Sequence, residues 1–223
     1  MIKKKLDFLK SMNTERGRRT RFKKKYNKTL LLIWNDFLKN NTKKDSLKLK
    51  IAFMLAKNFK YNHNGSSNND YFFHTLRIAT MLLFLKKKRI KNDLLILALL
   101  HNCLETTKTD YKLIINLFGK KIINEIKILT VNRKKQWSRI YKNNYYKKIN
   151  NSSKNARLVK IFDKLDNLFI LNENPNQDIK NKYLDEIQRY IIPMIKTDIY
   201  SLLQYFNGLI KNTYLLINKN KTI

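Results

Sequence analysis

The chain has 223 residues and a formal net charge of +32, with 43% hydrophobic residues but only four glycines and two prolines. Folds built from many short strands need more glycine and proline for their turns, so the composition excludes most sheet-rich folds and favours helices. One cysteine excludes an intramolecular disulfide framework, and no apolar run approaches the roughly 18 to 20 residues that span a bilayer.

From the N-terminus, the chain begins with a charge-dense basic segment over residues 1–28. Apolar residues then recur at helical spacing in a series of segments that polar loops separate. The expected helices cover residues 29–40, 45–60, 71–86, 94–101, 120–130, 156–171, 178–196 and 198–217, with a short helix between Asp110 and Gly119. We therefore expect an all-α fold with a basic N-terminal arm and accessory helix over 1–44, a main helical domain over 45–197, and a C-terminal helix over 198–223 packed on that domain.

Two of the three histidines fall on apolar segments. His101 ends the apolar run 94–100, and His74 lies in the expected helix 71–86. Asp163 lies among apolar neighbours in the helix 156–171, where a carboxylate is costly unless it is paired or bound to a metal. Each histidine alone could be a hydrogen-bonded core residue, but two imidazoles and one carboxylate together suit a first-row divalent ion such as Mn²⁺, Fe²⁺ or Zn²⁺.

Three sequence motifs surround these positions. They are Tyr71-Phe-Phe-His74-Thr-Leu-Arg-Ile-Ala79, then His101-Asn-Cys-Leu-Glu105-Thr-Thr107 followed by Phe118-Gly119, then Ala156-Arg-Leu-Val-Lys160-Ile-Phe-Asp163-Lys-Leu-Asp-Asn167. In residue type, order and spacing they resemble the HD-domain hydrolases of the RelA/SpoT type. Members of that family adopt an HD-domain helical bundle and remove the 3′-pyrophosphate from (p)ppGpp, the alarmone of the stringent response. The 223 residues leave no room for a synthetase domain, so the resemblance is to the small, hydrolase-only branch.

The resemblance implies a role for each matching position. A divalent metal, with Mn²⁺ as the first candidate, would be bound by His74, His101, Asn102 and Asp163. Catalysis would fall to Glu105 and Thr106, which stand at the positions of the acid pair that activates the attacking water. Substrate contacts would come from Ser67, Arg133, Lys134, Tyr145 and Asn167. The implied partner is a nucleotide substrate of the (p)ppGpp type.

Three departures from the family bear on activity. Asn102 replaces an aspartate, Thr106 replaces the second acid of the catalytic pair, and Gly65 and Ser66 stand in place of a basic pair. The expected function is therefore a metal-dependent phosphohydrolase resembling guanosine-3′,5′-bis(diphosphate) 3′-pyrophosphohydrolase, weakened at Asn102 and Thr106. Two alternatives stay open: a catalytically inactive HD-domain protein that binds nucleotide or nucleic acid, and an HD nucleotidase or pyrophosphatase with another substrate.

The high positive charge admits two interpretations. Lysine, asparagine and isoleucine have AT-rich codons, so drift in genome composition could have placed lysines on a solvated surface, or the surface was selected to bind nucleic acid. The stretch 132–154 mixes basic and aromatic residues and is either a base-stacking surface or a helix with buried aromatics. Without a secretory signal or membrane span, we expect a cytoplasmic protein with no membrane partner. Cys103 is expected to be buried rather than reactive.

Overall fold

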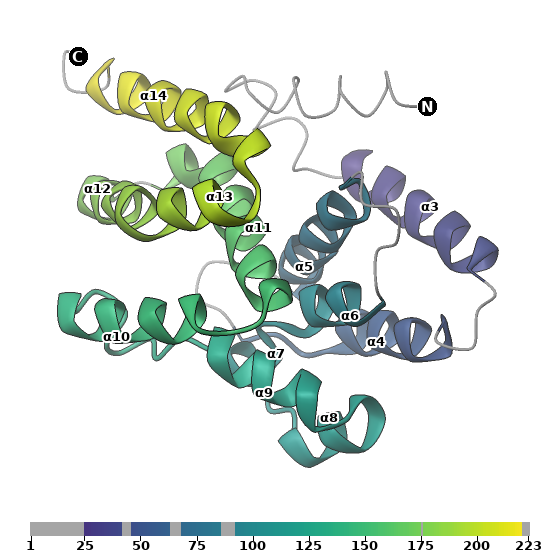
Figure 1. Cartoon of the computed structure of the whole chain (residues 1–223). Coiled ribbons are helices and arrows are strands. Elements are labelled where there is room, and N and C mark those ends of the chain that lie inside the picture. Colours follow the sequence, from purple (N-terminus) through teal and green to yellow (C-terminus); the bar gives the residue numbers. More distant parts are fainter. Residues whose placement is uncertain (1–24, 42–45, 63–67, 86–91, 175, 220–223) are drawn as a thin grey trace. The chain divides into compact units, whose positions relative to one another are not determined.

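The computed structural model describes residues 25–41, 46–62, 68–85, 92–174 and 176–219, and these residues form helices joined by loops, without a strand (Figure 1). The prediction of an all-α fold is therefore confirmed. None of the helices within these ranges is long and apolar enough to cross a membrane. The predicted substrate contact Ser67, the Gly65–Ser66 pair and most of the basic N-terminal segment lie outside the described residues.

The chain divides into two compact units. One unit comprises residues 30–163, and the other comprises residues 1–29 together with residues 164–223. Helices α3 (Lys25–Asn40) and α11 (Lys154–Ile170) cross the two division points. These points differ from the predicted domain boundaries after residues 44 and 197, which stay a prediction.

The most deeply buried element of the unit 30–163 is α6 (Asn92–Leu100). Its residues 94–100 are all buried, because the helix is apolar on every side and is enclosed by other helices. It packs against α4 (Ser46–Asn58), α5 (Asn68–Leu83) and α9 (Lys120–Leu129). The end of α6, which leads directly into His101, is therefore held inside the unit.

Helix α3 is joined to this core through Trp34, whose side chain is fully buried. Its indole N–H donates a hydrogen bond of 2.8 Å to the hydroxyl of Thr80 in α5, and its ring stacks on Phe53 of α4 with 5.9 Å between the ring centroids. A buried indole needs such a partner for its N–H. The helix predicted as an accessory thus contributes to the same core as α4 and α5.

Two short helices follow α6: α7 (Cys103–Thr106) and α8 (Tyr111–Phe118). The residues at both ends of α8 are ones that favour helix ends. Asp110 caps α8 by accepting a 2.9 Å hydrogen bond from the N–H of Lys112, and Gly119 ends it with φ +87°. Both residues bound the helix as the sequence predicted, since a short acceptor side chain and a residue free to adopt positive φ favour these two positions.

The basic and aromatic stretch 132–154 contains α10 (Arg139–Asn150). Its Tyr145 and Tyr146 are buried, whereas its lysines 147 and 148 are exposed. The helix therefore turns these two aromatic rings into the core and its charges into solvent. Trp137, which precedes the helix, is 38% exposed and lies under the ammonium group of Lys142.

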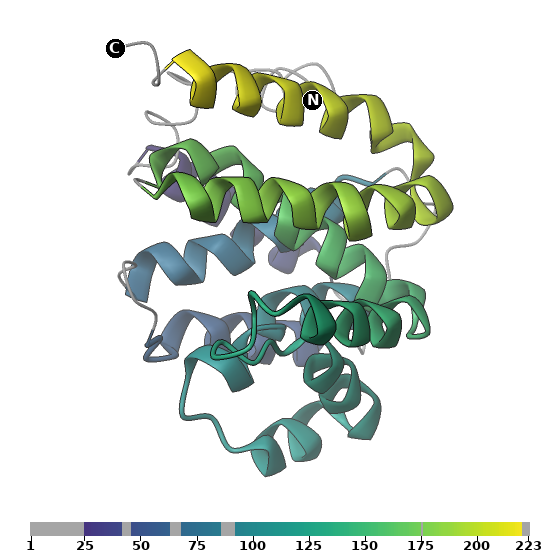
Figure 2. The same cartoon turned by 90° about the vertical axis from the view of Figure 1, so that its left-hand side faces the viewer.

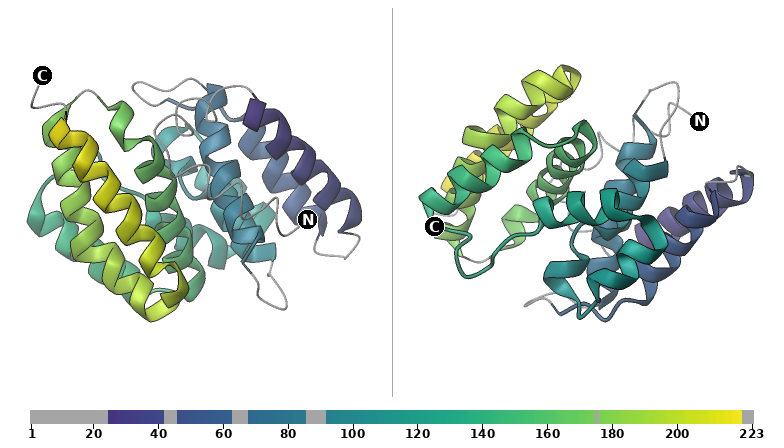
Figure 3. Two further views of the ribbon diagram at one scale, coloured as in Figure 1. Left: turned by 90° about the horizontal axis from the view of Figure 1, so that it is seen from above. Right: turned by 60° about the horizontal axis from the view of Figure 1, so that its bottom comes forward.

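The described part of the other unit contains the second half of α11 and the elements that follow it. These are η1 (Leu171–Glu173), α12 (Gln177–Glu186), the π-helical turn η2 (Ile187–Ile191), α13 (Ile192–Asp198), η3 (Tyr200–Leu202) and α14 (Leu203–Lys219). Figure 2 shows α12, η2 and α13 running on as one helix, and Figure 3 shows α14 alongside it. Proline crowds the carbonyl four residues earlier, and a wider π turn directly before Pro193 relieves that crowding.

The positive φ of Gly119 predicts that a larger residue at this position destabilises the fold. At φ +87° and ψ 167° an added Cβ is strained whatever space surrounds it, so we expect Gly119→Ala to lower the free energy of unfolding by about 1–3 kcal/mol. Gly208→Ala is the matched control, because Gly208 lies within α14 and its added Cβ meets no atom within 4 Å. This control should be neutral or stabilising. Urea unfolding measures both, and an unchanged midpoint for Gly119→Ala would contradict the assignment.

The burial of Cys103 predicts that its thiol reacts slowly in the folded chain. Burial raises the pKa of its thiol to about 12, so almost no thiolate is present near neutral pH. We expect the folded chain to react with a disulfide reagent at pH 8 at least about 100-fold more slowly than the unfolded chain. Unfolding in guanidinium should release one reactive thiol per chain, which serves as the internal control. Rapid reaction of the folded chain would show that Cys103 is accessible.

Candidate metal centre

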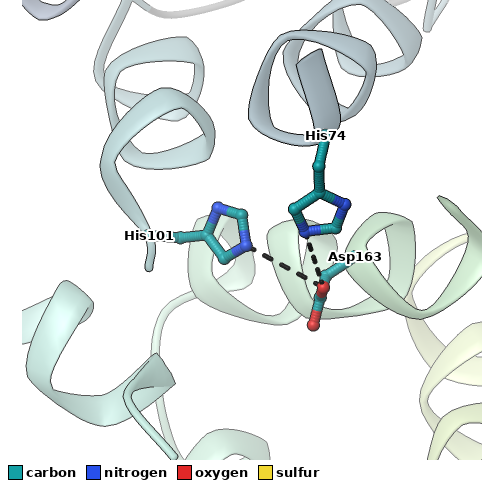
Figure 4. A group of neighbouring side chains, drawn as sticks. All are labelled: His74, His101 and Asp163. Carbon is teal, nitrogen blue, oxygen red and sulfur yellow. Dashed lines mark ion pairs between the residues drawn. The ribbon is translucent and has the colours of Figure 1, made fainter. Parts of the chain in front are cut away.

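Three buried side chains converge within the unit 30–163: His74 of α5, His101 in the turn after α6, and Asp163 of α11 (Figure 4). The Nε2 atom of His74 lies 3.3 Å from Oδ1 of Asp163, and Nε2 of His101 lies 3.9 Å from the same oxygen. All three ligand atoms lie within 4.8 Å of one another. A first-row metal with bonds of about 2.0–2.2 Å allows two of its donors to be separated by up to about 4.2 Å, so both distances to Asp163 fit one ion.

The hydrogen bonding of His101 leaves one ring nitrogen available. Its Nδ1 lies 2.8 Å from the carbonyl oxygen of Ala98, and because a carbonyl only accepts, Nδ1 carries the proton. In the neutral ring, Nε2 then holds a lone pair. Among the described residues this fully buried Nε2 has no hydrogen-bond partner. A buried acceptor without a partner is costly, and a bound metal is the partner that this tautomer suits.

Asp163 is held from its other side by Lys160, one helical turn earlier in α11. The Lys160 ammonium donates a hydrogen bond of 2.9 Å to Oδ2 of Asp163, and the Lys160 side chain is only 2% exposed. Burial alone would raise the pKa of Asp163, but the Lys160 ammonium and the two imidazoles outweigh burial and hold this pKa well below its usual range. Asp163 is therefore an anion that keeps Oδ1 facing the histidines.

The ring of Tyr145 packs against the Lys160 side chain. The Lys160 ammonium lies 5.5 Å from the centre of the Tyr145 ring, and the Tyr145 hydroxyl donates a 2.6 Å hydrogen bond to the carbonyl of Leu129. Burial lowers the pKa of Lys160, but the negative charge of Asp163 and the contact with Tyr145 raise it above its usual value. Lys160 thus carries a permanent charge, and Tyr145, predicted to contact substrate, lies buried beneath it.

Asn102 lies beside the cluster and is buried. Its amide nitrogen donates a hydrogen bond of 2.9 Å to the hydroxyl of Tyr71, whose ring meets His74 edge-on at 5.5 Å between centroids. Burial raises the pKa of the Tyr71 hydroxyl, so the hydroxyl stays neutral. An amide binds metal only through its oxygen and without charge, so Asn102 adds at most one neutral donor to the site.

The two residues predicted to be catalytic differ in their surroundings. One carboxylate oxygen of Glu105 accepts a 2.9 Å hydrogen bond from the N–H of Val131, and the other pairs with the guanidinium of Arg133. The Glu105 side chain is only 4% exposed. The Thr106 hydroxyl instead donates to the backbone carbonyl of Asn102 at 2.8 Å. Glu105 therefore offers a carboxylate held by two contacts, whereas the Thr106 hydroxyl stabilises the turn that contains Asn102.

The remaining predicted contacts are spread over the chain. Arg133 and Lys134 are exposed in the loop between α9 and α10, and Asn167 follows Asp163 by one turn of α11 but belongs to the other compact unit. Sequence reasoning assigned no role to Lys160 or Tyr71. Their spacing was the available signal, because each stands three residues before a predicted ligand, Asp163 or His74, on the same helix.

Comparisons with known proteins support the fold. No protein-family model and no curated protein matches the sequence. One solved structure that matches is described as a metazoan ortholog of SpoT that hydrolyzes ppGpp and plays a role in starvation responses. It superposes with a TM-score of 0.55 at 19% sequence identity, over 79% of this chain and 97% of that chain. At this identity the likeness shows a shared fold, and it confirms the HD-domain-like helical bundle predicted from the sequence.

Proposed function

We propose that this chain is a metal-dependent phosphohydrolase that removes the 3′-pyrophosphate of (p)ppGpp or a closely similar nucleotide. The observation that carries the proposal is the buried cluster of His74, His101 and Asp163, in which Nε2 of His101 has no hydrogen-bond partner among the described residues. The order of the three sequence motifs supports the choice of substrate. The ppGpp hydrolysis described for the metazoan SpoT ortholog of similar fold supports it further.

A divalent ion at this cluster would lower the pKa of a bound water and neutralise charge on the pyrophosphate. His74, His101 and Asp163 are the residues that would hold it, with the amide oxygen of Asn102 as the proposed fourth ligand. Imidazole and carboxylate donors suit first-row divalent ions, and among these we propose Mn²⁺ because the family resemblance implies it. The hydrogen bond from Nδ1 of His101 to Ala98 fixes the orientation of that ring, as Lys160 fixes that of Asp163.

Glu105 is the group we assign to accept the proton of the attacking water. The N–H of Val131 and the guanidinium of Arg133 hold its carboxylate in place. The guanidinium of Arg133 is partly exposed and is suited to contact substrate phosphate, as is the exposed Lys134. Asn167 is proposed as a nucleotide contact on the family resemblance. Thr106 contributes by holding the turn of Asn102.

One observation favours a second candidate, a protein that binds the nucleotide without hydrolysing it. Asp163 is the one carboxylate in the described cluster, because the neighbouring position is the amide of Asn102 and the carboxylate of Glu105 is already paired with Arg133. A metal held by one charged ligand binds less firmly. Hydrolysis and binding are separated by measuring both on the same preparation.

The proposal predicts that purified chain, given Mn²⁺ and ppGpp, releases pyrophosphate and GDP. We expect Asp163→Asn to lower this rate at least about 100-fold and to lower bound metal, since it removes the charged ligand. Asp178→Asn is the matched control, because Asp178 is an exposed acid of α12 whose ion pair is with Lys182. It should leave rate and metal content unchanged. Circular dichroism verifies that each variant is folded.

The outcomes separate the candidates. Nucleotide binding with no pyrophosphate release at stoichiometric enzyme would contradict hydrolysis and support the binding protein. Release of phosphate from other nucleotides, with none from ppGpp, would move the proposal to a nucleotidase or pyrophosphatase of another substrate. Equal loss of activity in Asp163→Asn and Asp178→Asn would show that the cluster is not the site.

A further inference from the structure

Asp163 and Glu105, two acids of the candidate site, are each already paired with a base. Oδ2 of Asp163 accepts from Lys160 at 2.9 Å, and Glu105 pairs with Arg133. Asn102, at the edge of the cluster, is neutral. With neutral imidazoles, these paired charges sum to zero before a metal enters.

Lys160 is buried and held beside Asp163, so its positive charge belongs to the site. Its side chain is 2% exposed, it stands three residues before Asp163 on the same helix, and the ring of Tyr145 lies 5.5 Å from its ammonium. Tyr145 is itself held by its hydrogen bond to the carbonyl of Leu129. The Lys160 ammonium is therefore shielded from solvent, and water does not screen its charge. Arg133 differs, because its side chain is 45% exposed and its charge is screened by water.

A divalent ion at the cluster would consequently add two positive charges beside a buried cation. Uncompensated charge in a buried site is costly. Asp163 cannot compensate for it, because its charge already balances Lys160. A ligand with two or more negative charges restores the balance, and phosphate and pyrophosphate groups are ligands of this kind.

We infer that the cluster takes up its divalent metal together with a phosphate or pyrophosphate anion, and that Lys160 is the positioning residue that couples the two. This inference rests on the proposed function and adds to it the order and interdependence of binding. Because such coupling is reciprocal, the anion raises the affinity for metal by the same factor as the metal raises the affinity for the anion. Metal alone binds weakly, and the substrate's own pyrophosphate completes the site.

Equilibrium dialysis of the full chain tests this coupling. Mn²⁺ is varied with and without inorganic phosphate, chloride keeps the ionic strength equal and high, and elemental analysis gives the excess metal in the protein chamber. Phosphate complexes of Mn²⁺ equilibrate across the membrane, so the excess reports only bound metal. We expect phosphate to raise the apparent affinity of the wild-type chain for Mn²⁺ at least about tenfold, within the usual range of coupling between two ligands.

Two kinds of variant assign the effect to the site. Asn102→Asp adds a carboxylate, and Lys160→Met removes the fixed cation, so in both we expect Mn²⁺ alone to bind more tightly and the gain from phosphate to shrink to less than about threefold. Lys160→Arg keeps the charge and should keep the gain. Lys148→Met is the matched control at an exposed lysine of α10 and should behave as wild type. Asn102→Asp decides the question if Lys160→Met fails to fold.

The failures are distinguishable. Stoichiometric Mn²⁺ in the wild-type chain with no effect of phosphate would overturn the coupling and leave the metal-dependent function standing. An equal phosphate effect in wild type, Lys160→Met and Asn102→Asp would trace it to the basic surface and overturn the role of Lys160. No bound Mn²⁺ under any condition, in wild type or Asn102→Asp, would overturn the proposed function itself.

Discussion

The contact between Lys160 and Asp163 is the constraint on which the rest of the site depends. A carboxylate buried in an apolar helical unit must be paired, and Lys160 provides the pair from the same helix at 2.9 Å. Because this contact occupies Oδ2, Oδ1 is left for His74 and His101. The histidines come from α5 and from the end of α6, two helices that pack closely on each other. The packing of α5 against α6 therefore builds the core of the unit and also brings the two histidines to Asp163.

The electrostatic state of the site follows from two positions. An amide at residue 102 brings no charge, and its nitrogen hydrogen bonds with Tyr71 instead. A lysine at residue 160 cancels the charge of the remaining carboxylate. The net charge of +32 over the whole chain adds a long-range attraction for anions. On the proposed coupling, a site with this balance binds a metal that arrives with a highly charged phosphate group and retains a bare metal poorly.

Much of the fold was predictable from local signals. Helical periodicity located the helices, and Asp110 and Gly119 marked the ends of α8 because capping depends on neighbouring residues only. The three candidate ligand positions were predicted from polar residues on apolar helices together with the family motifs around them. The predicted helix 94–101 extended one residue too far, because the chain turns at His101 and Asn102, where Nδ1 of His101 hydrogen bonds with the carbonyl of Ala98.

Contacts between distant segments were not predictable. Glu105 and Arg133 are 28 positions apart, and nothing in either neighbourhood indicates their ion pair. The sequence left open whether Tyr145 contacts substrate or lies in the core, and the structure shows it buried against Lys160. The spacing of Lys160 and Asp163 was visible, but whether that face of α11 turns inward depends on the packing of α5 and α6. The substrate loop at Gly65–Ser67 stays a prediction, since it lies outside the described residues.

We propose that His74, His101 and Asp163 together bind one metal ion. Anomalous diffraction at the manganese absorption edge, from crystals grown with Mn²⁺ and phosphate, tests it most directly. We expect a single strong anomalous peak within bonding distance of Nε2 of both histidines and Oδ1 of Asp163, with the Lys160 ammonium still hydrogen-bonded to Oδ2. A peak bound by other residues, or an occupied anion site with no peak at the cluster, would contradict it.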